Sequence, residues 1–267
     1  MDLRIEGKRA LVTGGSRGIG KAIAHALARE GADVALLARN REALDAAAAE
    51  IAGASGRRVV GVRADTTVDA EVRIAVEQAT TLLGGGIDIL VNAAAEPAGY
   101  ASPPALEAIT GDFFRREMDI KVMGYIRAAR EVVPHMKQTG WGRIINISGL
   151  AARQTGNVVG SMRNVSVAAL TKNLADELGP CGINVTVVHP GVTRTERTAG
   201  LVRSKALEEG TSEEAIELRM TGANSIRRLV DASEIADVVA FLASPLSLAI
   251  NGEAMAVGGG APKSIYY

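Results

Sequence analysis

The chain has 267 residues, of which 47% are hydrophobic and 3% aromatic, and its 30 basic and 30 acidic side chains give a pI near 6.9. This balance provides no electrostatic basis for capturing nucleic acid or an anionic membrane surface, and the three histidines are too scattered to predict a metal site. A single cysteine, Cys181, excludes an intrachain disulfide, and the first residues are not apolar enough for a signal peptide, so we expect a soluble, cytoplasmic protein.

Short runs rich in Val, Ile and Leu alternate with longer, Ala-rich amphipathic segments. The short runs are continuous rather than alternating, which is typical of strands buried on both faces. In chain order we expect strands at 9–15, 32–39, 57–65, 87–94, 142–148, 183–191 and 253–260, and helices at 18–30, 41–53, 68–83, 112–138, 162–179 and 232–243. The alternation predicts one α/β domain of the Rossmann type, a doubly wound parallel sheet of about seven strands with helices on both faces.

One segment, between Thr193 and about Ile226, interrupts this alternation. It is charged, weakly periodic and long for a connection. Connections of this length often cover a ligand site, so we predict that 193–226 forms a substrate lid, with a disordered segment as the alternative.

A glycine-rich turn, "TGGSRGIG", follows the first predicted strand at residues 13–20. Its glycines allow a tight turn and close backbone approach, and the helix that begins there offers free N–H groups and a positive dipole end. We therefore predict that the turn binds the pyrophosphate of a dinucleotide. A glycine turn needed only for packing is the alternative.

These features resemble the short-chain dehydrogenase/reductase family, whose TGxxxGxG turn is matched by "TGGSRGIG". Further landmarks follow in the family's order: Asp65 after the third strand, "VNAA" at the end of the fourth, "GRIINIS" as the fifth and "VHPGVTRT" after the sixth. The resemblance covers residues 5 to about 260. It implies hydride transfer between a nicotinamide cofactor and a carbonyl or alcohol, in a homodimer or homotetramer. Tyr266 and Tyr267 are expected to extend a subunit contact.

The expected cofactor is NADP(H), with NAD(H) as the alternative. The second strand ends at Ala38, where a carboxylate would clamp the ribose hydroxyls of NAD, and Arg39 follows, with Arg17 in the glycine turn. Two guanidiniums suit a phosphate, although Arg39 could instead be only an exposed turn residue. By resemblance, the cofactor would be held by Gly14, Ser16, Arg17, Gly18, Ile19, Gly20, Arg39, Asp65, Asn92, Ala93, Ala94, Pro190, Gly191, Thr193 and Thr195.

The resemblance also implies a catalytic Tyr, a Lys one helical turn later, a Ser on the fifth strand and an Asn on the preceding long helix. The landmark "ALTKNLA" sets the register, and it puts Gly160 at the Tyr position and Asn164 at the Lys position. The Ser position falls on Gly149, or on Ser148 after a shift of one residue, and the Asn position is Lys121. The chain therefore departs from the family where the family performs general acid–base catalysis.

The candidate catalytic residues are Ser148, Lys121 and Asn164. The tyrosine cannot be recovered by a register error, because residues 126 to 265 contain none. Lys121 and Tyr125 lie one turn apart on a predicted helix and could bring an ammonium near a phenol. Alternatively, Tyr125 packs at a subunit interface while Lys121 is solvated or ion-paired.

A second possibility is a polar cluster near the nicotinamide. Arg153, Asn157, Arg163 and Asn164 could together bind an anionic or carbonyl ligand, or serve only as loop and helix-cap residues.

Three functions remain open at this stage. One is an NADP(H)-dependent oxidoreductase with a nonstandard or impaired hydride-transfer site, and another is an inactive nucleotide-binding sensor or oligomer partner. The third is a lyase or isomerase that uses the same pocket. A positioned acid–base group contributes about 10²–10⁴ in rate, so ordinary alcohol dehydrogenation would be slow without a substitute. We favour the oxidoreductase, and the sequence does not specify its substrate.

Overall fold

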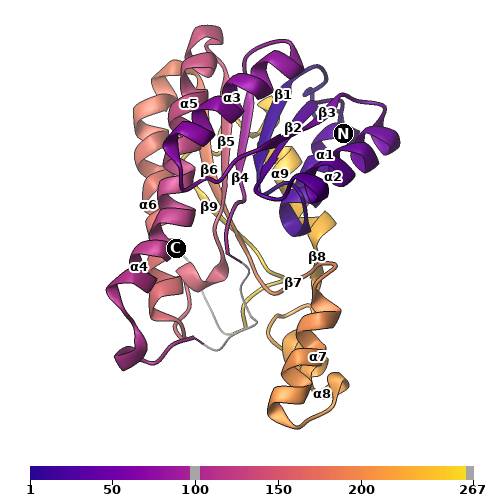
Figure 1. The fold of residues 1–267 in the computed structure, drawn as a ribbon, viewed down its shortest axis with the longest axis vertical. Helices are drawn as coiled ribbons and strands as arrows, with labels where there is room; N and C mark the ends of the chain where they lie inside the picture. The colour runs from indigo at the N-terminus through magenta and orange to yellow at the C-terminus, as the bar shows by residue number, and fades with distance from the viewer. Residues whose placement is uncertain (97–102, 263–267) are drawn as a thin grey trace.

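A parallel sheet forms the centre of the computed structural model, which describes residues 1–96 and 103–262 (Figure 1). Its seven strands lie in the order β3-β2-β1-β4-β5-β6-β9. They are β1 (Arg9–Thr13), β2 (Asp33–Ala38), β3 (Val59–Arg63), β4 (Ile89–Asn92), β5 (Gly142–Ile147), β6 (Ile183–Pro190) and β9 (Ala254–Val257). Every pair of neighbours is parallel, which confirms the predicted fold. The strand order reverses between β1 and β4, the place where such sheets bind ligands at their carboxyl edge.

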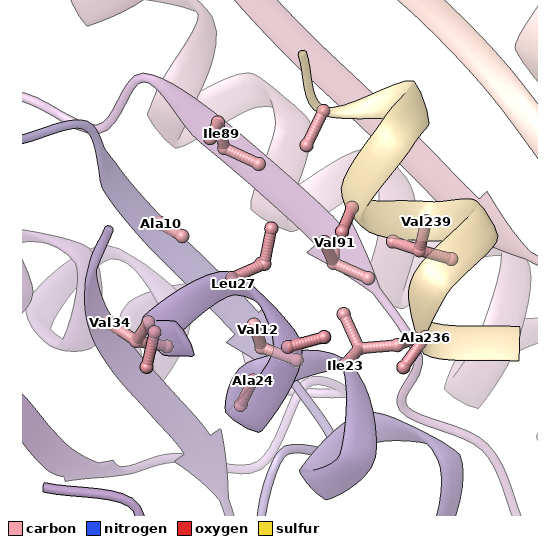
Figure 2. Packing of buried hydrophobic residues seen from close by; sticks show 14 of the residues in the cluster. Ala10, Val12, Ile23, Ala24, Leu27, Val34, Ile89, Val91, Ala236 and Val239 are labelled. Carbon is pink, nitrogen blue, oxygen red and sulfur yellow. The ribbon is translucent and has the colours of Figure 1, made fainter. Parts of the chain in front are cut away.

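Helices cover both faces of the sheet. One layer contains α1 (Gly18–Arg29), α2 (Arg41–Ser55) and α9 (Ala232–Leu242), and the other contains α3 (Asp69–Leu83), α5 (Gly124–Thr139) and α6 (Val158–Leu178). Figure 2 shows the first layer, in which Ile23 and Leu27 of α1 pack against Val12 and Val91 of the sheet and near Val239 of α9. Short 3₁₀ helices lie at Leu106–Ala108, Leu150–Ala152, Gly179–Cys181 and Pro245–Ser247.

The long helix predicted at 112–138 is divided into three parts. It consists of α4 (Gly111–Met118), a π-helical segment η2 (Asp119–Met123) and α5. π-Helical turns are rare in proteins, and those that occur often lie at functional sites. The π-helical turn of this chain contains Lys121.

The segment 193–226, predicted to form a substrate lid, is mostly helical. It contains α7 (Thr198–Glu209) and α8 (Glu213–Thr221), and its start, β7 (Thr193–Arg194), pairs with β8 (Val230–Asp231). The two helices form an arm that extends from the body of the molecule (Figure 1). Their shared core consists of few residues, Val202, Ala206 and Ile216 with Met220 against them, which explains the weak periodicity of the sequence.

Within 1–96 and 103–262, no helix is both long and apolar enough to cross a membrane. Tyr266 and Tyr267, expected at a subunit contact, lie outside the described residues.

Candidate active site

A cavity of about 910 Å³ opens at the carboxyl edge of the sheet, within the usual size range of ligand pockets. It is bounded by the glycine turn, the loops after the strands, the start of α6 and the arm. The predicted cofactor residues that line it are Gly14, Ser16, Arg17, Gly18, Ile19, Gly20, Arg39, Asp65, Ala93, Ala94, Pro190, Gly191, Thr193 and Thr195. The candidate catalytic residues Lys121, Ser148 and Asn164, together with Gly160, line the same cavity.

Asn92 is the one predicted cofactor residue that does not line the cavity among the residues the structure describes. It is 1% exposed, and its Nδ2 donates to Oδ1 of Asn146 on β5 over 3.0 Å. Asn146 in turn donates to Thr171 of α6 (3.0 Å). Asn92 therefore connects the strand ends to α6, because its side chain points into the layer between the sheet and that helix.

The glycine turn is shaped for close backbone approach. At Gly14 the backbone has φ +69°, and a Cβ there would lie 2.8 Å from the carbonyl oxygen of Ala93, so only glycine fits. The amide of Gly18, the first residue of α1, donates to Oε1 of Glu196 over 2.9 Å. A carboxylate thus already lies at the helix N-terminus, which shows that this turn accommodates an anion and fits the pyrophosphate of a dinucleotide.

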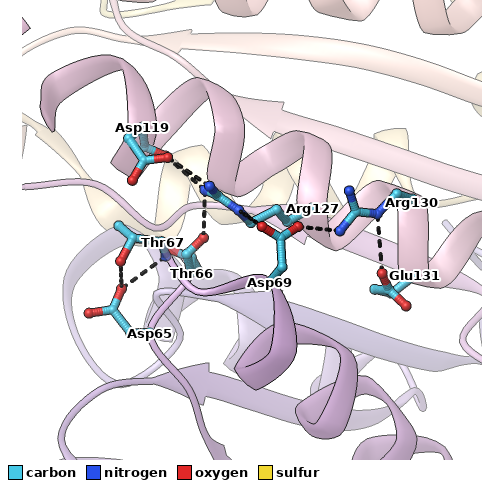
Figure 3. Close-up of polar contacts among 8 residues, drawn as sticks. All are labelled: Asp65, Thr66, Thr67, Asp69, Asp119, Arg127, Arg130 and Glu131. Carbon is cyan, nitrogen blue, oxygen red and sulfur yellow. Dashed lines mark hydrogen bonds and ion pairs between the residues drawn. The ribbon is translucent and has the colours of Figure 1, made fainter. Parts of the chain in front are cut away.

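The loop after β3 is held in place by hydrogen bonds and ion pairs (Figure 3). Oδ1 of Asp65 accepts from the amide and the hydroxyl of Thr67 (2.9 and 2.8 Å). Burial raises the pKa of Asp65, but these bonds and the charge of Arg39 outweigh it, so the pKa lies below its ordinary value. Arg127 of α5 donates to Asp119 (2.8 Å) and to Asp69 (3.2 Å), and so ties the start of α3 to η2. The end of the cavity lined by Asp65 and the π-helical segment are thereby fixed relative to each other.

Arg39 lies at the same end of the cavity, with 56% of its side chain exposed. Its Nη2 is 3.6 Å from Oε1 of Glu96, which also faces Arg116 at 3.4 Å. The guanidinium is accessible and only weakly paired, because exposed ion pairs of this length contribute little.

Lys121 is the most perturbed titratable group of the cavity. It is 5% exposed, and its Nζ donates to the carbonyl oxygen of Ser148 (2.9 Å) and to Oδ1 of Asn164 (3.0 Å). Burial lowers the pKa of Lys121 to about 7, the charge of Arg163 acts in the same direction and that of Glu117 opposes it. The ammonium has three N–H donors, so one is left beyond these two bonds.

The other predicted catalytic positions adjoin Lys121. Ser148 donates its hydroxyl to the backbone carbonyl of Asn164 (3.0 Å). A Cβ at Gly149 would lie 3.2 Å from Nδ2 of Asn164, so a side chain there would crowd the amide that holds Lys121.

Gly160 lies inside α6, because the helix begins at Val158 rather than at the predicted residue 162. The N-cap of the helix is Asn157, whose side chain accepts from the amide of Gly160 over 2.7 Å. A Cβ at Gly160 would approach the Asn157 side chain to 2.7 Å. The space that a larger residue would need is therefore occupied by the cap.

Tyr125 does not line the cavity and is buried in the interior of the chain. It is 1% exposed, and its hydroxyl donates to the carbonyl oxygen of Ile147 (2.8 Å), the residue before the one that Lys121 contacts. Burial raises the pKa of Tyr125 above its ordinary value. The ammonium of Lys121 and the phenol of Tyr125 thus bond to consecutive backbone carbonyls at the end of β5, but the phenol does not line the cavity.

The predicted polar cluster of four residues does not form as a unit. Arg153 donates to the carbonyl of Ala254 (2.9 Å), and Arg163 forms an ion pair with Glu117 of α4. Asn157 is a helix cap, as the alternative had it. Sequence reasoning also missed Glu196, since a single acidic residue after Thr195 has no pattern that would reveal its contact with the glycine turn.

No metal site accompanies this cavity in the described ranges, where no three His, Cys, Asp or Glu side chains gather to bind an ion. The strand order, the glycine turn and the cavity at the switch point together define the class of Rossmann-type α/β proteins.

The chain belongs to the short-chain dehydrogenase/reductase family. The family model described as enoyl-(acyl carrier protein) reductase matches residues 14–262. A relative named dehydrogenase/reductase SDR family member 4, from Pongo abelii, is 35% identical over 97% of this chain and 88% of its own length. L-Sorbose reductase from Gluconobacter frateurii, solved with NADPH and L-sorbose, has a TM-score of 0.91 and 29% identity over 99% of this chain and all of its own. The structure of NAD⁺-bound xylitol dehydrogenase has a TM-score of 0.86 and 29% identity, covering 96% of this chain and 100% of that one.

Proposed function

We propose that this protein is an NADP(H)-dependent oxidoreductase in which Lys121 supplies the proton that the family obtains from a tyrosine. The observation that carries the proposal is a buried ammonium that lines the cavity and whose pKa is lowered to about 7. A general acid works best when its pKa lies near the operating pH, because it then both holds and releases its proton.

The proposal treats the active site as nonstandard. In the register set by the sequence, Gly160 and Asn164 occupy the positions of the family's Tyr and Lys, and Lys121 occupies the position of the family's Asn. Compared with the family, lysine and asparagine have therefore exchanged positions. The hydrogen bond between Lys121 and Asn164 (3.0 Å) supports this view, since the two groups still meet. Asn164 then acts as a positioning residue that orients the ammonium.

The cofactor fits the residues of the turn and the second strand. The amide of Gly18 and the side chains of Ser16 and Thr195 would hold the phosphates, and Arg17 with Arg39 would hold a 2′-phosphate. The preference for NADP(H) rests on those two guanidiniums and on the absence of a carboxylate at Ala38.

When bound, NADPH supplies a hydride to the carbonyl carbon of a substrate. The remaining N–H of Lys121 donates a hydrogen bond to the carbonyl oxygen and transfers its proton to it, so that an alcohol forms and Lys121 becomes a neutral amine. Solvent then returns the proton. The carbonyl of Ser148 and Oδ1 of Asn164 hold Nζ throughout, which fixes the direction of the third N–H. In the reverse direction the neutral amine accepts the alcohol proton.

The test combines binding and turnover. Calorimetric titration with NADPH and NADH is followed by NADPH oxidation with a panel of aldehydes, ketones and quinones. We expect the Lys121→Met variant to lose about 10²–10⁴ in kcat while binding NADPH as the native protein does. Lys172→Met is the matched control, since Lys172 lies on the exposed face of α6, paired with Asp176.

Two results would contradict the proposal. Tight NADPH binding without turnover of any carbonyl would favour a nucleotide-binding sensor or oligomer partner. No binding of either nucleotide would mean that the turn has only an architectural role.

A further inference from the structure

We infer that the substrate carries an anionic group, a carboxylate or a phosphate, which Lys205 of the arm binds while the carbonyl lies at Lys121. The inference rests on the proposed function for the position of the carbonyl. It concerns the substrate end of the cavity, defined here as the part lined by η2, the end of β5, the start of α6 and the arm.

The charged side chains at the substrate end are all cationic. They are Lys121, Arg163, Arg197 and Lys205, and no Asp or Glu of the described ranges lines this end. The ion pair with Glu117 neutralises Arg163. The two carboxylates of the lining, Asp65 and Glu96, follow β3 and β4, and Glu96 faces Arg39 and Arg116 (3.6 and 3.4 Å). The elements that form the substrate end therefore contribute only positive charge to the cavity.

Lys205 is directed to the cavity by the geometry of α7. The cavity-lining residues of this helix are Thr198, Leu201 and Lys205, spaced three and four residues apart, and this spacing places them on one face. The adjacent side of the helix, about a quarter turn away, carries Val202 and Ala206, which pack against α8.

Lys205 is a basic residue in a mostly acidic arm, and unlike the other basic residues of the arm it forms no ion pair among the described residues. Residues 198–221 contain five Glu and three basic residues, so the arm as a whole is acidic. The other two basic residues, Arg203 and Arg219, pair with Glu213 (3.5 Å) and Glu209 (2.7 Å). Lys205 is half-buried, and nowhere in the described part of the chain does it meet a carboxylate within ion-pair distance.

The chemistry of the lining limits the ligand further. Leu150, Leu201 and Met220 supply apolar surface to the same end of the cavity. A half-buried ammonium gains most from a charged acceptor, because hydrogen bonds between ionised groups are about twice as strong as neutral ones. A short carbonyl compound with an apolar middle and an anionic end matches this arrangement.

The experiment compares anionic carbonyl compounds with neutral partners that share their carbon skeleton. Levulinate is compared with methyl levulinate, and dihydroxyacetone phosphate with dihydroxyacetone. Binding to the 267-residue chain is measured by calorimetry with and without NADP⁺, and reduction is measured with NADPH. We expect at least one anionic probe to bind roughly 10- to 100-fold more tightly than its neutral partner, the range of one charge-assisted bond.

Variants locate the source of this preference. Lys205→Gln should abolish it, and Lys205→Glu should reverse it. Arg203→Gln on the same helix should keep it, because Arg203 is 71% exposed and faces Glu213. A preference within the levulinate pair would identify the anionic group of the substrate as a carboxylate, and a preference within the dihydroxyacetone pair would identify it as a phosphate.

The outcomes separate this inference from the proposed function. Equal binding of charged and neutral probes, or an unchanged preference in Lys205→Gln, would overturn the anion site even if neutral carbonyls are reduced. A preference that depends on Lys205, without reduction of any probe, would support the anion site and count against the oxidoreductase.

Discussion

The buried ammonium of Lys121 makes the stability of this protein depend on pH in a defined direction. Its pKa is lowered from 10.5 to about 7 in the folded chain, chiefly by burial. At roughly 1.4 kcal/mol per pKa unit, burial of the charged ammonium destabilises the folded state by about 5 kcal/mol. Between pH 7 and 10.5 the unfolded chain binds more protons than the folded one, so the free energy of unfolding rises with pH in this window. Below pH 7 the full penalty is present.

The measurement compares native protein with Lys121→Met by denaturant unfolding at pH 6, 7, 8 and 9. Methionine leaves two acceptors unpaired, at a pH-independent cost of about 1–3 kcal/mol each, so only the slope is informative. Relative to Lys121→Met, the native protein should gain about 2–3 kcal/mol of unfolding free energy between pH 7 and 9. Lys172→Met should show no such slope, because its pairing with Asp176 raises the pKa of Lys172 above the range tested.

A difference between native protein and Lys121→Met that is constant from pH 6 to 9 would refute the reasoning. It would mean that the ammonium is solvated or paired in solution and keeps an ordinary pKa. The rate of carbonyl reduction gives an independent check, because a required ammonium predicts a rate that falls about tenfold per pH unit above pH 7.

Three further predictions concern the rest of the cavity. Glu196→Gln should tighten NADPH binding about two- to fivefold in a calorimetric titration, because the carboxylate competes with phosphate for the amide of Gly18; unchanged affinity would show that the two do not compete. Arg39→Asp should weaken NADPH binding at least tenfold and leave NADH nearly unaffected, and equal losses would remove the basis for an NADP(H) preference. Gly160→Tyr should lower unfolding free energy by about 1–3 kcal/mol, because the new Cβ would lie 2.7 Å from Asn157. Adding Asn157→Ala should recover part of that loss in thermal unfolding, and no recovery would place the strain elsewhere.

The fold was predictable because its signals are local and repeat along the chain. Continuous Val, Ile and Leu runs identify buried parallel strands, and the glycine turn between the first strand and helix identifies the class of fold. The predicted strands correspond to the seven observed, and the helix ends mostly agree within two residues. The larger exception is α6, which begins at Val158, because Asn157 caps it although the following Val158-Val159-Gly160 is a weak helix former.

The features that sequence could not reveal depend on where side chains point. Asn92 ends a strand as expected, but its amide turns to Asn146 rather than to the cavity. The arm helices were missed because their common core is small. The contact between Glu196 and Gly18 joins residues 178 positions apart and carries no local pattern.

The proposed function treats Lys121 as a replacement proton donor, and the packing around Lys121 supports that view over a simple loss of catalytic residues. An unused position so deeply buried would be filled more favourably by methionine, which resembles lysine in length and brings no charge into the interior. Lys121 instead keeps an ammonium there, with its donors matched by the Ser148 carbonyl and by Asn164. The neighbouring glycines fit the same arrangement, since a side chain at Gly149 would press on Asn164 and one at Gly160 would press on the N-cap of α6. A site that had only lost its function would not need Lys121, Asn164 and the two glycines to fit one another. A proton donor does need this fit, because the third N–H of Lys121 has to be held in one direction.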